Sequence, residues 1–377
     1  MTEWLLIAGD FTTCGGMDRA NHALATALAG RADTRVHIVA HHVDAPLGGR
    51  RSVHATLVPR PFGAHLLGAP LLARAGTRRA RALGSTARVV VNGGNALAGD
   101  IVWVHYVHAA YTPAARAWRM RVQAPLAHAY AVARERRALG DARVIVCNSR
   151  RTAEDVQRAR DVDPRRIRVV YYGSDATILQ PVAASERQAT RVALGWDPER
   201  PVAAFVGALG DRRKGFDRLF DAWELLSRDP RWDVDLVVVG AGAELPAWQR
   251  RAATGVLRDR VRFLGFRRDV PRVLAACDLL VHPARYEAYG LSVHEAICRG
   301  VPALVSARAG IAELYPPDLA EWLLADVEDA PAIADAVRRW RVDPDAARLR
   351  VGDLAERLRG RTWDLMTDEF VRTVEAA

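Results

Sequence analysis

The sequence feature that most constrains the fold is the recurrence of short apolar runs separated by helical segments. In the first half these runs are WLLIAGD, RVHIVA, ARVVVN, DIVWVH, RVIVCN and RVVYYG. A second series comprises PVAAFVG, VDLVVVG, RVRFLG, LLVHP, PALVS and EWLL. Strands that are apolar along their whole length are typical of parallel sheets with helices on both faces. The sequence therefore predicts an α/β chain made of two doubly wound, Rossmann-like halves.

A polar passage between the two series lacks a strand pattern and ends in proline, so we place a linker at residues 176–200. The predicted domains are then residues 1–175 and residues 201–360. A closing helical pattern in residues 361–377 could pack on either domain. Ligands of such sheets bind beyond the carboxyl ends of the strands, so two facing halves predict a binding cleft between them.

Length and composition suit a globular chain of two domains, because half of the 377 residues are apolar. No apolar run approaches the roughly 18 residues that cross a bilayer, and the N-terminus enters a strand pattern without a cleavage site. We therefore expect a cytoplasmic protein. The cysteines have neither CxxC spacing nor nearby histidines at metal-ligand spacing, so we expect buried thiols and no metal site. They are Cys14, Cys147, Cys277 and Cys298.

The formal charge of +10 would suit nucleic acid, an anionic membrane or a negatively charged substrate, and charge alone does not choose among them. No nucleic-acid recognition motif accompanies it, so we expect no nucleic-acid partner. Among the lysine and arginine residues, the only lysine is Lys214. Because an ammonium group is a compact point charge, Lys214 is a candidate for a role that arginine cannot fill.

Two glutamates eight residues apart mark the most informative stretch, HPARYEAYGLSVHEAICRGVPALVS at residues 282–306. Glu287 precedes a predicted helix and Glu295 lies about one turn inside it. The backbone N–H groups between them lie at the positive end of the helix dipole, where a pyrophosphate is stabilised. Those groups belong to Tyr289, Gly290 and Leu291. Taken alone, each glutamate would more often be an exposed helix residue than a ligand contact.

This pattern resembles the E-x7-E signature of retaining glycosyltransferases with the GT-B fold, specifically glycosyltransferase family 4. The resemblance implies that Glu287 contacts hydroxyls of the donor sugar and that Glu295 holds the nucleotide ribose. Carboxylates suit both tasks, since each accepts two hydroxyl hydrogen bonds. The family also implies a donor of the UDP- or GDP-sugar type, retention of anomeric configuration, and neither a metal nor another cofactor.

A second matching segment, FVGALGDRRKGFDRLFDAW, places Lys214 where the family keeps a lysine for the donor phosphates. Negative charge grows on the leaving oxygens as the glycosidic bond breaks, and a compact cation stabilises it. The alternative is a solvated lysine at a helix start. The family's arginine after the strand glycine is replaced by Ala208, and Arg212 or Arg213 is the candidate for the missing phosphate contact.

Three further matches lie in the first half. The Gly15–Gly16 pair resembles the family's loop near the donor phosphates and acceptor. His105 ends a strand where the family carries a histidine, which implies that it faces the donor sugar or reaction centre; a hydrogen-bonded core histidine is the alternative, and His108 is the less favoured choice. Tyr172 replaces the asparagine of the family's N-G-x-D stretch, so only a hinge role carries over. The closing helix resembles the family's terminal helix, which crosses back to the first domain.

Two further patterns concern nucleotide binding and membrane contact. GAGAEL at residues 240–245 lacks the third glycine of a dinucleotide fingerprint, so backbone contact with a nucleotide base fits it better. The leucine-rich segment at residues 60–83 could lie on an anionic membrane face, or form an ordinary amphipathic helix with a solvated basic side. Its arginines are Arg74, Arg78, Arg79 and Arg81.

The sequence thus predicts a metal-independent retaining glycosyltransferase that acts on a hydroxyl of a carbohydrate, a lipid-linked or a small-molecule acceptor. Peripheral contact with the inner membrane face is an additional expectation. One alternative is a GT-B subunit that binds nucleotide without turnover, which the change at Ala208 suggests. Another is a nucleotide-sugar epimerase, against which the E-x7-E region argues.

Overall fold

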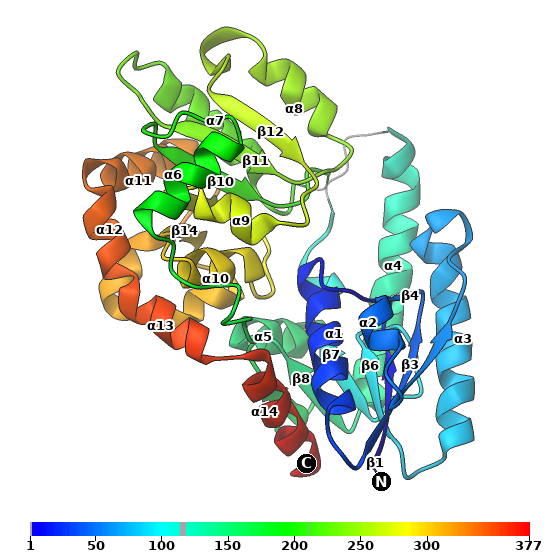
Figure 1. Cartoon of the computed structure of the whole chain (residues 1–377). Helices are drawn as coiled ribbons and strands as arrows, with labels where there is room; N and C mark the ends of the chain where they lie inside the picture. The colour runs from blue at the N-terminus through cyan, green and yellow to red at the C-terminus, as the bar shows by residue number, and fades with distance from the viewer. Residues whose placement is uncertain (1, 114–117, 211) are drawn as a thin grey trace. The chain divides into compact units, whose positions relative to one another are not determined.

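The computed structural model describes residues 2–113, 118–210 and 212–377, and the chain divides into two compact units (Figure 1). The first unit contains the described residues up to Thr112, together with Val122–Gly173 and Arg361–Ala377. The second unit is built on Ser174–Gly360.

The two units are not simply the first and second halves of the chain, as two segments show. The last helix, α14 (Trp363–Glu375), belongs to the first unit and packs on α1 (Gly16–Ala29). Residues 176–200, which we expected to form a linker, carry helix α6 (Ala184–Ala193) and are part of the second unit.

The first unit contains a seven-stranded parallel sheet of order β5-β3-β1-β6-β7-β8-β9. Chain order reverses between β1 and β6, as in doubly wound folds, which confirms the predicted architecture. Its strands are β1 (Thr2–Ile7), β3 (Thr34–Ala40), β5 (Val53–Leu57), β6 (Arg88–Asn92), β7 (Ile101–Val104), β8 (Val144–Cys147) and β9 (Ile167–Val169). A short parallel pair joins β2 (Asp10–Phe11) to β4 (His42–Val43).

Strand β5 was not predicted because only its first residue, Val53, is buried. An edge strand with a mostly exposed VHATL sequence lacks the continuous apolar signal of the central strands. The other strands of this sheet coincide with the apolar runs.

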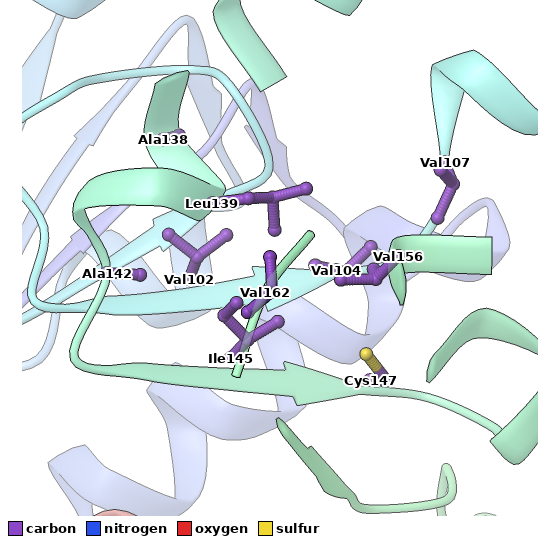
Figure 2. Close-up of a cluster of buried hydrophobic side chains, with 10 residues drawn as sticks. All are labelled: Val102, Val104, Val107, Ala138, Leu139, Ala142, Ile145, Cys147, Val156 and Val162. Carbon is purple, nitrogen blue, oxygen red and sulfur yellow. The ribbon is translucent and has the colours of Figure 1, made fainter. Parts of the chain in front are cut away.

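Helices and apolar side chains cover this sheet. Figure 2 shows one cluster, in which β7 and β8 pack against residues of α4 (Trp118–Asp141) and α5 (Arg150–Ala159). Its members are Val102, Val104, Val107, Ala138, Leu139, Ala142, Ile145, Cys147, Val156 and Val162. This unit also contains helices α2 (Ala45–Gly48) and α3 (His65–Leu83).

The second unit repeats the arrangement with a six-stranded parallel sheet of order β12-β11-β10-β13-β14-β15, reversing between β10 and β13. Its strands are β10 (Val202–Val206), β11 (Asp235–Val239), β12 (Val261–Gly265), β13 (Leu279–His282), β14 (Ala303–Ser306) and β15 (Leu323–Leu324). Its longer helices are α7 (Phe216–Ser227), α8 (Leu245–Ala252), α10 (Leu291–Cys298), α11 (Ala330–Val342) and α13 (Gly352–Gly360); α9 (Val270–Ala275) and α12 (Pro344–Arg350) are shorter.

The glycines of GAGAEL bring two loops into backbone contact. A Cβ atom on Gly240, whose φ is 151°, would lie 1.8 Å from the carbonyl oxygen of Gly207. A Cβ atom on Gly242 would lie 2.2 Å from the carbonyl oxygen of Leu209. The loops after β10 and β11 therefore pack backbone to backbone, which explains these two glycines without a ligand.

Within the described residues, no helix is both long and apolar enough to cross a membrane. The same residues contain no group of three or more His, Cys, Asp or Glu side chains arranged to hold a metal ion. All four cysteines are free, and three of them are buried as expected. Cys14 differs, because it is only partly buried.

Candidate functional site

The loops that follow β10 and β13 meet at the point where strand order reverses in the second sheet. Ligands of doubly wound sheets bind at such a point, beyond the carboxyl ends of the strands. Gly215, with φ of 71°, directly precedes α7 and approaches the other loop so closely that a Cβ atom would lie 1.9 Å from the Pro283 carbonyl oxygen. The contact between these loops therefore requires the glycine of the lysine-glycine pair.

Three side chains from these loops and from β13 form a charged cluster. The Lys214 ammonium group is paired with Oε2 of Glu287. The same oxygen lies 2.8 Å from Nε2 of His282, the last residue of β13. The side chains of Lys214, Glu287 and His282 are 16%, 11% and 0% exposed, so the cluster is largely shielded from water.

The electrostatics of this cluster favour an ionised carboxylate. Burial raises the pKa of Glu287, but Lys214, the hydrogen bond from His282 and the charge of Arg213 outweigh it and hold that pKa well below its usual value. Burial lowers the pKa of His282, which keeps its ring neutral at physiological pH. A neutral ring that contacts a carboxylate through Nε2 must carry its proton there, so His282 donates to Glu287.

The start of α10 follows directly. Gly290 precedes the helix with φ of 112°, and a Cβ atom there would lie 2.8 Å from Cγ2 of Ile311. The Tyr289 side chain is buried, with its hydroxyl 2.7 Å from Nδ1 of His294, so only its backbone lies at the helix start. Leu291 is the first helical residue, and Glu295, which is 5% exposed, lies in the second turn.

The two arginines before Lys214 have different surroundings. Arg212 lies 3.7 Å from both the Asp217 and Glu244 carboxylates. Arg213 donates to the Tyr286 carbonyl oxygen at 3.4 Å, and its charge lowers the pKa of Glu287. Arg213 therefore lies beside the charged cluster, whereas Arg212 is directed toward two other acidic side chains.

In the first unit, Gly15 adopts φ of 83° and directly precedes α1, whose first residue is Gly16. The left-handed φ explains a glycine at this turn. Burial, reinforced by neighbouring Asp10, raises the pKa of Asp18 in the first turn of α1 to about 6.

His105 follows β7 and lies in a buried network of neutral side chains. Its Nδ1 contacts the Tyr172 hydroxyl, and its Nε2 lies 3.3 Å from Oδ1 of Asn21. Asn148 donates through Nδ2 to the Tyr172 hydroxyl at 3.1 Å and to the His105 carbonyl oxygen at 3.2 Å. Burial lowers the pKa of His105 to about 3, so the ring is neutral. This environment has the features of the hydrogen-bonded core histidine named as the alternative.

Tyr172 requires a correction to the sequence analysis, which gave it only a hinge role. Its side chain is 3% exposed, and its hydroxyl joins Asn148 to His105. A hydroxyl both donates and accepts, so Tyr172 donates to Nδ1 of His105 while accepting from Asn148.

His108 lies one turn further on, and its backbone is held by a buried acid. Its N–H donates to both carboxylate oxygens of Glu135 in α4, at 3.1 and 3.0 Å. Glu135 is 1% exposed, and burial raises its pKa to about 7 although N–H groups of His108 and Ala109 oppose the shift.

Two protein families match this chain. The family described as Glycosyltransferase Family 4 matches residues 14–177, and the one described as Glycosyl transferases group 1 matches residues 200–343. The two matches fall on the two units and include both the Gly15–Gly16 loop and the Lys214–Glu287 cluster. The chain belongs to glycosyltransferase family 4.

This family 4 member is similar to proteins named D-inositol 3-phosphate glycosyltransferase. It is 29% identical to the one from Corynebacterium efficiens over 71% of this chain and 66% of that protein. It is 28% identical to the one from Corynebacterium glutamicum over 71% of this chain and 67% of that protein. A third, from Corynebacterium diphtheriae, is matched over only 55% of its length, so these alignments span about two thirds of the relatives or less.

Solved structures share the fold of this family 4 member. Anabaena HepE in complex with UDP and glucose has a TM-score of 0.74 at 20% identity, with all of both chains covered. WaaG, a glycosyltransferase involved in lipopolysaccharide biosynthesis, has a TM-score of 0.77 at 20% identity over 97% of this chain and 99% of that one. The likeness confirms the predicted GT-B class of two Rossmann-like units.

Sequence reasoning missed His282 and the hydroxyl of Tyr172. A signal for His282 was present, because it ends an apolar strand only five residues before Glu287. No comparable signal marked Tyr172, whose partners are 67 and 24 residues distant in sequence.

Proposed function

We propose that this family 4 member transfers a sugar from a nucleotide diphosphate donor to a hydroxyl of a carbohydrate, lipid-linked or small-molecule acceptor, with retention of anomeric configuration. The observation that carries the proposal is the Lys214–Glu287 pair at the strand-order reversal, next to the start of α10. A cation, a carboxylate and helix N–H groups together match a diphosphate attached to a sugar.

In this proposal, the reaction is accelerated mainly by stabilisation of the leaving pyrophosphate. Lys214 and the N–H groups of Gly290 and Leu291 at the start of α10 neutralise the pyrophosphate as its bond to the sugar breaks. Arg213, which lies beside the cluster, supplies the second cation that the family carries at the position of Ala208; Arg212 is the less suited of the two because it faces Asp217 and Glu244. These side chains provide the positive charge, so we propose that the reaction needs no metal ion.

Carboxylates bind the hydroxyl groups of the donor. Glu287 is ionised and held in place by His282, so its oxygens accept hydrogen bonds from the sugar. Glu295 accepts from the ribose hydroxyls, and Gly15 and Gly16 allow the α1 loop to approach the donor phosphates. His105 is proposed to face the donor sugar as a neutral ring.

Names of similar proteins suggest the first substrates to test. The similar Corynebacterium proteins are named for D-inositol 3-phosphate, and HepE structures hold UDP, glucose or UDP-glucose. We therefore propose a UDP- or GDP-sugar as donor and a phosphorylated cyclitol as the first acceptor to try.

A donor screen tests this function directly. UDP- and GDP-sugars are incubated with acceptor, with and without EDTA, and the product anomer is assigned by NMR. Transfer with retention that EDTA leaves unchanged is the expected result. Nucleotide binding without turnover would instead indicate a binding subunit, and a new nucleotide sugar formed without acceptor would indicate an epimerase.

We also propose that the first unit contacts an anionic membrane through α3 and the turn before it. Phe62 is 98% exposed, and Leu66, Leu67 and Leu71 on α3 are exposed as well. A groove of about 460 Å³ lies beside this helix, with four arginines in its lining: Arg74, Arg78, Arg81 and Arg134. Arg79, which we had grouped with them, contacts Nδ1 of His37 at 2.8 Å and is not part of the groove.

Exposed apolar side chains next to several arginines suit the boundary between lipid acyl chains and anionic headgroups. Each arginine near an anionic surface contributes about 1 kcal/mol, so reversing Arg74, Arg78 and Arg81 to glutamate should abolish most binding to phosphatidylglycerol vesicles. Co-sedimentation at low salt measures it. A variant with the same charge change in the second unit, R228E/R250E/R339E, should still bind; equal loss in both variants would mean that net charge alone is responsible.

A further inference from the structure

Arg285 links the loop before Glu287 to the loop that carries Lys214. Its Nη1 donates to the Arg212 carbonyl oxygen at 2.6 Å. Nη1 and Nη2 also donate to the two carboxylate oxygens of Asp217, at 2.7 and 2.9 Å. Its backbone N–H donates to the Arg213 carbonyl oxygen at 2.9 Å. One residue therefore bonds the backbone on the N-terminal side of Lys214 and the first turn of α7 on its C-terminal side.

The loop that Arg285 holds has an uncommon backbone conformation. Arg212 has φ of 57°, in the left-handed region that non-glycine residues rarely adopt. Its carbonyl oxygen accepts from the Gly215 N–H at 3.0 Å as well as from Arg285. Such a conformation persists where its surroundings hold it in place. The guanidinium of Arg285 is one of the groups that do so.

Only a planar, forked cation makes all of these contacts together. Arginine pairs with both oxygens of a carboxylate while keeping further N–H groups for other acceptors, whereas lysine is a single ammonium. Arg285 uses this geometry fully, because Glu328 also accepts from its Nη2 at 2.9 Å. The side chain is 19% exposed, so these bonds are partly shielded from water.

We propose that Arg285 is a positioning residue that fixes the Lys214 ammonium group where it meets Glu287 and the leaving pyrophosphate. It acts through the loop at residues 212–215 and does not touch the donor. The inference rests on the proposed transferase function, and it adds a residue that lies between the two glutamates' motif and the lysine loop without belonging to either.

Arg218 offers a matched control. It lies in the first turn of α7 and donates to Glu328 at 3.0 Å and to Asp221 at 3.2 Å. Arg218 thus shares one carboxylate with Arg285, but these side-chain hydrogen bonds go to other side chains, and its backbone bond to Gly215 survives a change of side chain. Replacing Arg218 with alanine tests the loss of a cation that is paired with Glu328 without the loss of the Arg285 contacts to the loop.

A double-mutant cycle tests the proposal, with turnover measured for the parent and for R285A, K214A, R285A/K214A and R218A. If Arg285 acts through Lys214, R285A should lower kcat by about 10²-fold, since displacement of a catalytic group by an ångström costs about that much. In the K214A background the same change should cost no more than about threefold, because the interaction it supports has already gone. R218A should retain the kcat of the parent.

Two results would overturn the inference. One is an equal effect of R285A with and without Lys214, and the other is a loss in R218A as large as that in R285A. The thermal unfolding transition of each variant shows whether that variant is folded. If R285A does not fold, R285K takes its place: it keeps the charge but lacks the fork, so the same loss of kcat, again absent without Lys214, is expected.

Failure of the inference is distinguishable from failure of the proposed function. If the parent turns over a donor and the cycle is additive, only the role of Arg285 is wrong. If the parent turns over no donor, the function is wrong, and the same cycle is measured on UDP and GDP affinity by calorimetry. Coupling between Arg285 and Lys214 in nucleotide binding would then support the positioning role, and its absence would refute it.

Discussion

The two units each place a buried histidine at the carboxyl end of a central strand, and the two histidines have opposite kinds of partners. His105 follows β7 and contacts the neutral side chains of Tyr172 and Asn21. His282 ends β13 and contacts the carboxylate of Glu287, which is also paired with Lys214. Burial lowers the pKa of both rings, so both are neutral donors or acceptors.

Buried acids show the same contrast. Glu135 in the first unit accepts from backbone N–H groups, and burial raises its pKa to about 7. Glu287 in the second unit has Lys214 and Arg213 nearby, and these charges hold its pKa well below normal. At Glu287 the cations outweigh burial, whereas at Glu135 the backbone N–H groups and the charge of Arg136 do not. A titratable group that is paired with cations beyond the carboxyl ends of the strands is a candidate for a role in catalysis. A network of neutral side chains instead holds its members in fixed positions.

The largest effect is expected when the charged cluster of the second unit loses its lysine. Lys214→Ala should reduce turnover by about 10² to 10³, because a preorganised cation aimed at the leaving group is lost. Steady-state kinetics with the donor found in the screen measures it. Lys214→Arg is the informative control: if it restores full activity, a compact ammonium group is not what the site requires.

His282→Ala should have the next largest effect. It removes the Nε2–H donor from the buried Glu287 carboxylate, which then keeps Lys214; the loss costs about 1 to 3 kcal/mol and corresponds to a loss of about 10 to 10² in activity. His282→Gln keeps an N–H near the position of Nε2 and should recover much of the loss. Turnover and donor KM are measured for both, and equal activity of His282→Ala and the parent would contradict the proposed support of Glu287.

Tyr172→Phe should have a smaller effect, because it alters a neutral network. The change removes the donor to Nδ1 of His105, at a cost of about 1 kcal/mol in the free energy of unfolding. The ring should keep its proton on Nε2, because Oδ1 of Asn21 still accepts from it, while Nδ1 loses its donor. ¹⁵N NMR of labelled histidine detects the changed Nδ1 resonance, and an unchanged resonance would contradict the hydrogen bond from Tyr172.

The smallest effect on turnover is expected for Glu135→Gln. This substitution should mainly change how the free energy of unfolding depends on pH. The folded pKa of about 7 lies above the ordinary value of 4.5, so the folded state binds the proton more tightly. Stability of the parent should therefore fall as pH rises from 4.5 to 7, by about 3 kcal/mol from this group, and then level off.

Thermal unfolding between pH 5 and 8 tests this sign. Glu135→Gln should flatten the slope and keep the hydrogen bond to His108 through its amide oxygen. Some slope should remain, because the raised pKa of Asp18, about 6, acts in the same direction. A parent that becomes more stable with rising pH would contradict the proposed contribution of Glu135.

Much of the fold was predictable because its signal is local. Each central strand is a continuous apolar run, and the order of runs and helices along the chain leads to two doubly wound sheets. Edge strand β5, with four of its five residues exposed, carries no such run and was missed. The Lys214 and Glu287 loops were identifiable because each follows a predicted strand and carries residues suited to a sugar diphosphate.

By itself, the sequence determined the two doubly wound units, the central strands of their sheets and the segments that carry Lys214, Glu287 and Glu295. Only the tertiary structure decided that His282 donates to Glu287, that Arg285 holds the Lys214 loop and that Tyr172 contacts His105. The physical reason is the distance along the sequence over which each feature is determined. Strand and helix periodicity is fixed by neighbouring residues, whereas the partner of a buried polar group depends on which distant segment the packed fold brings within about 3 Å.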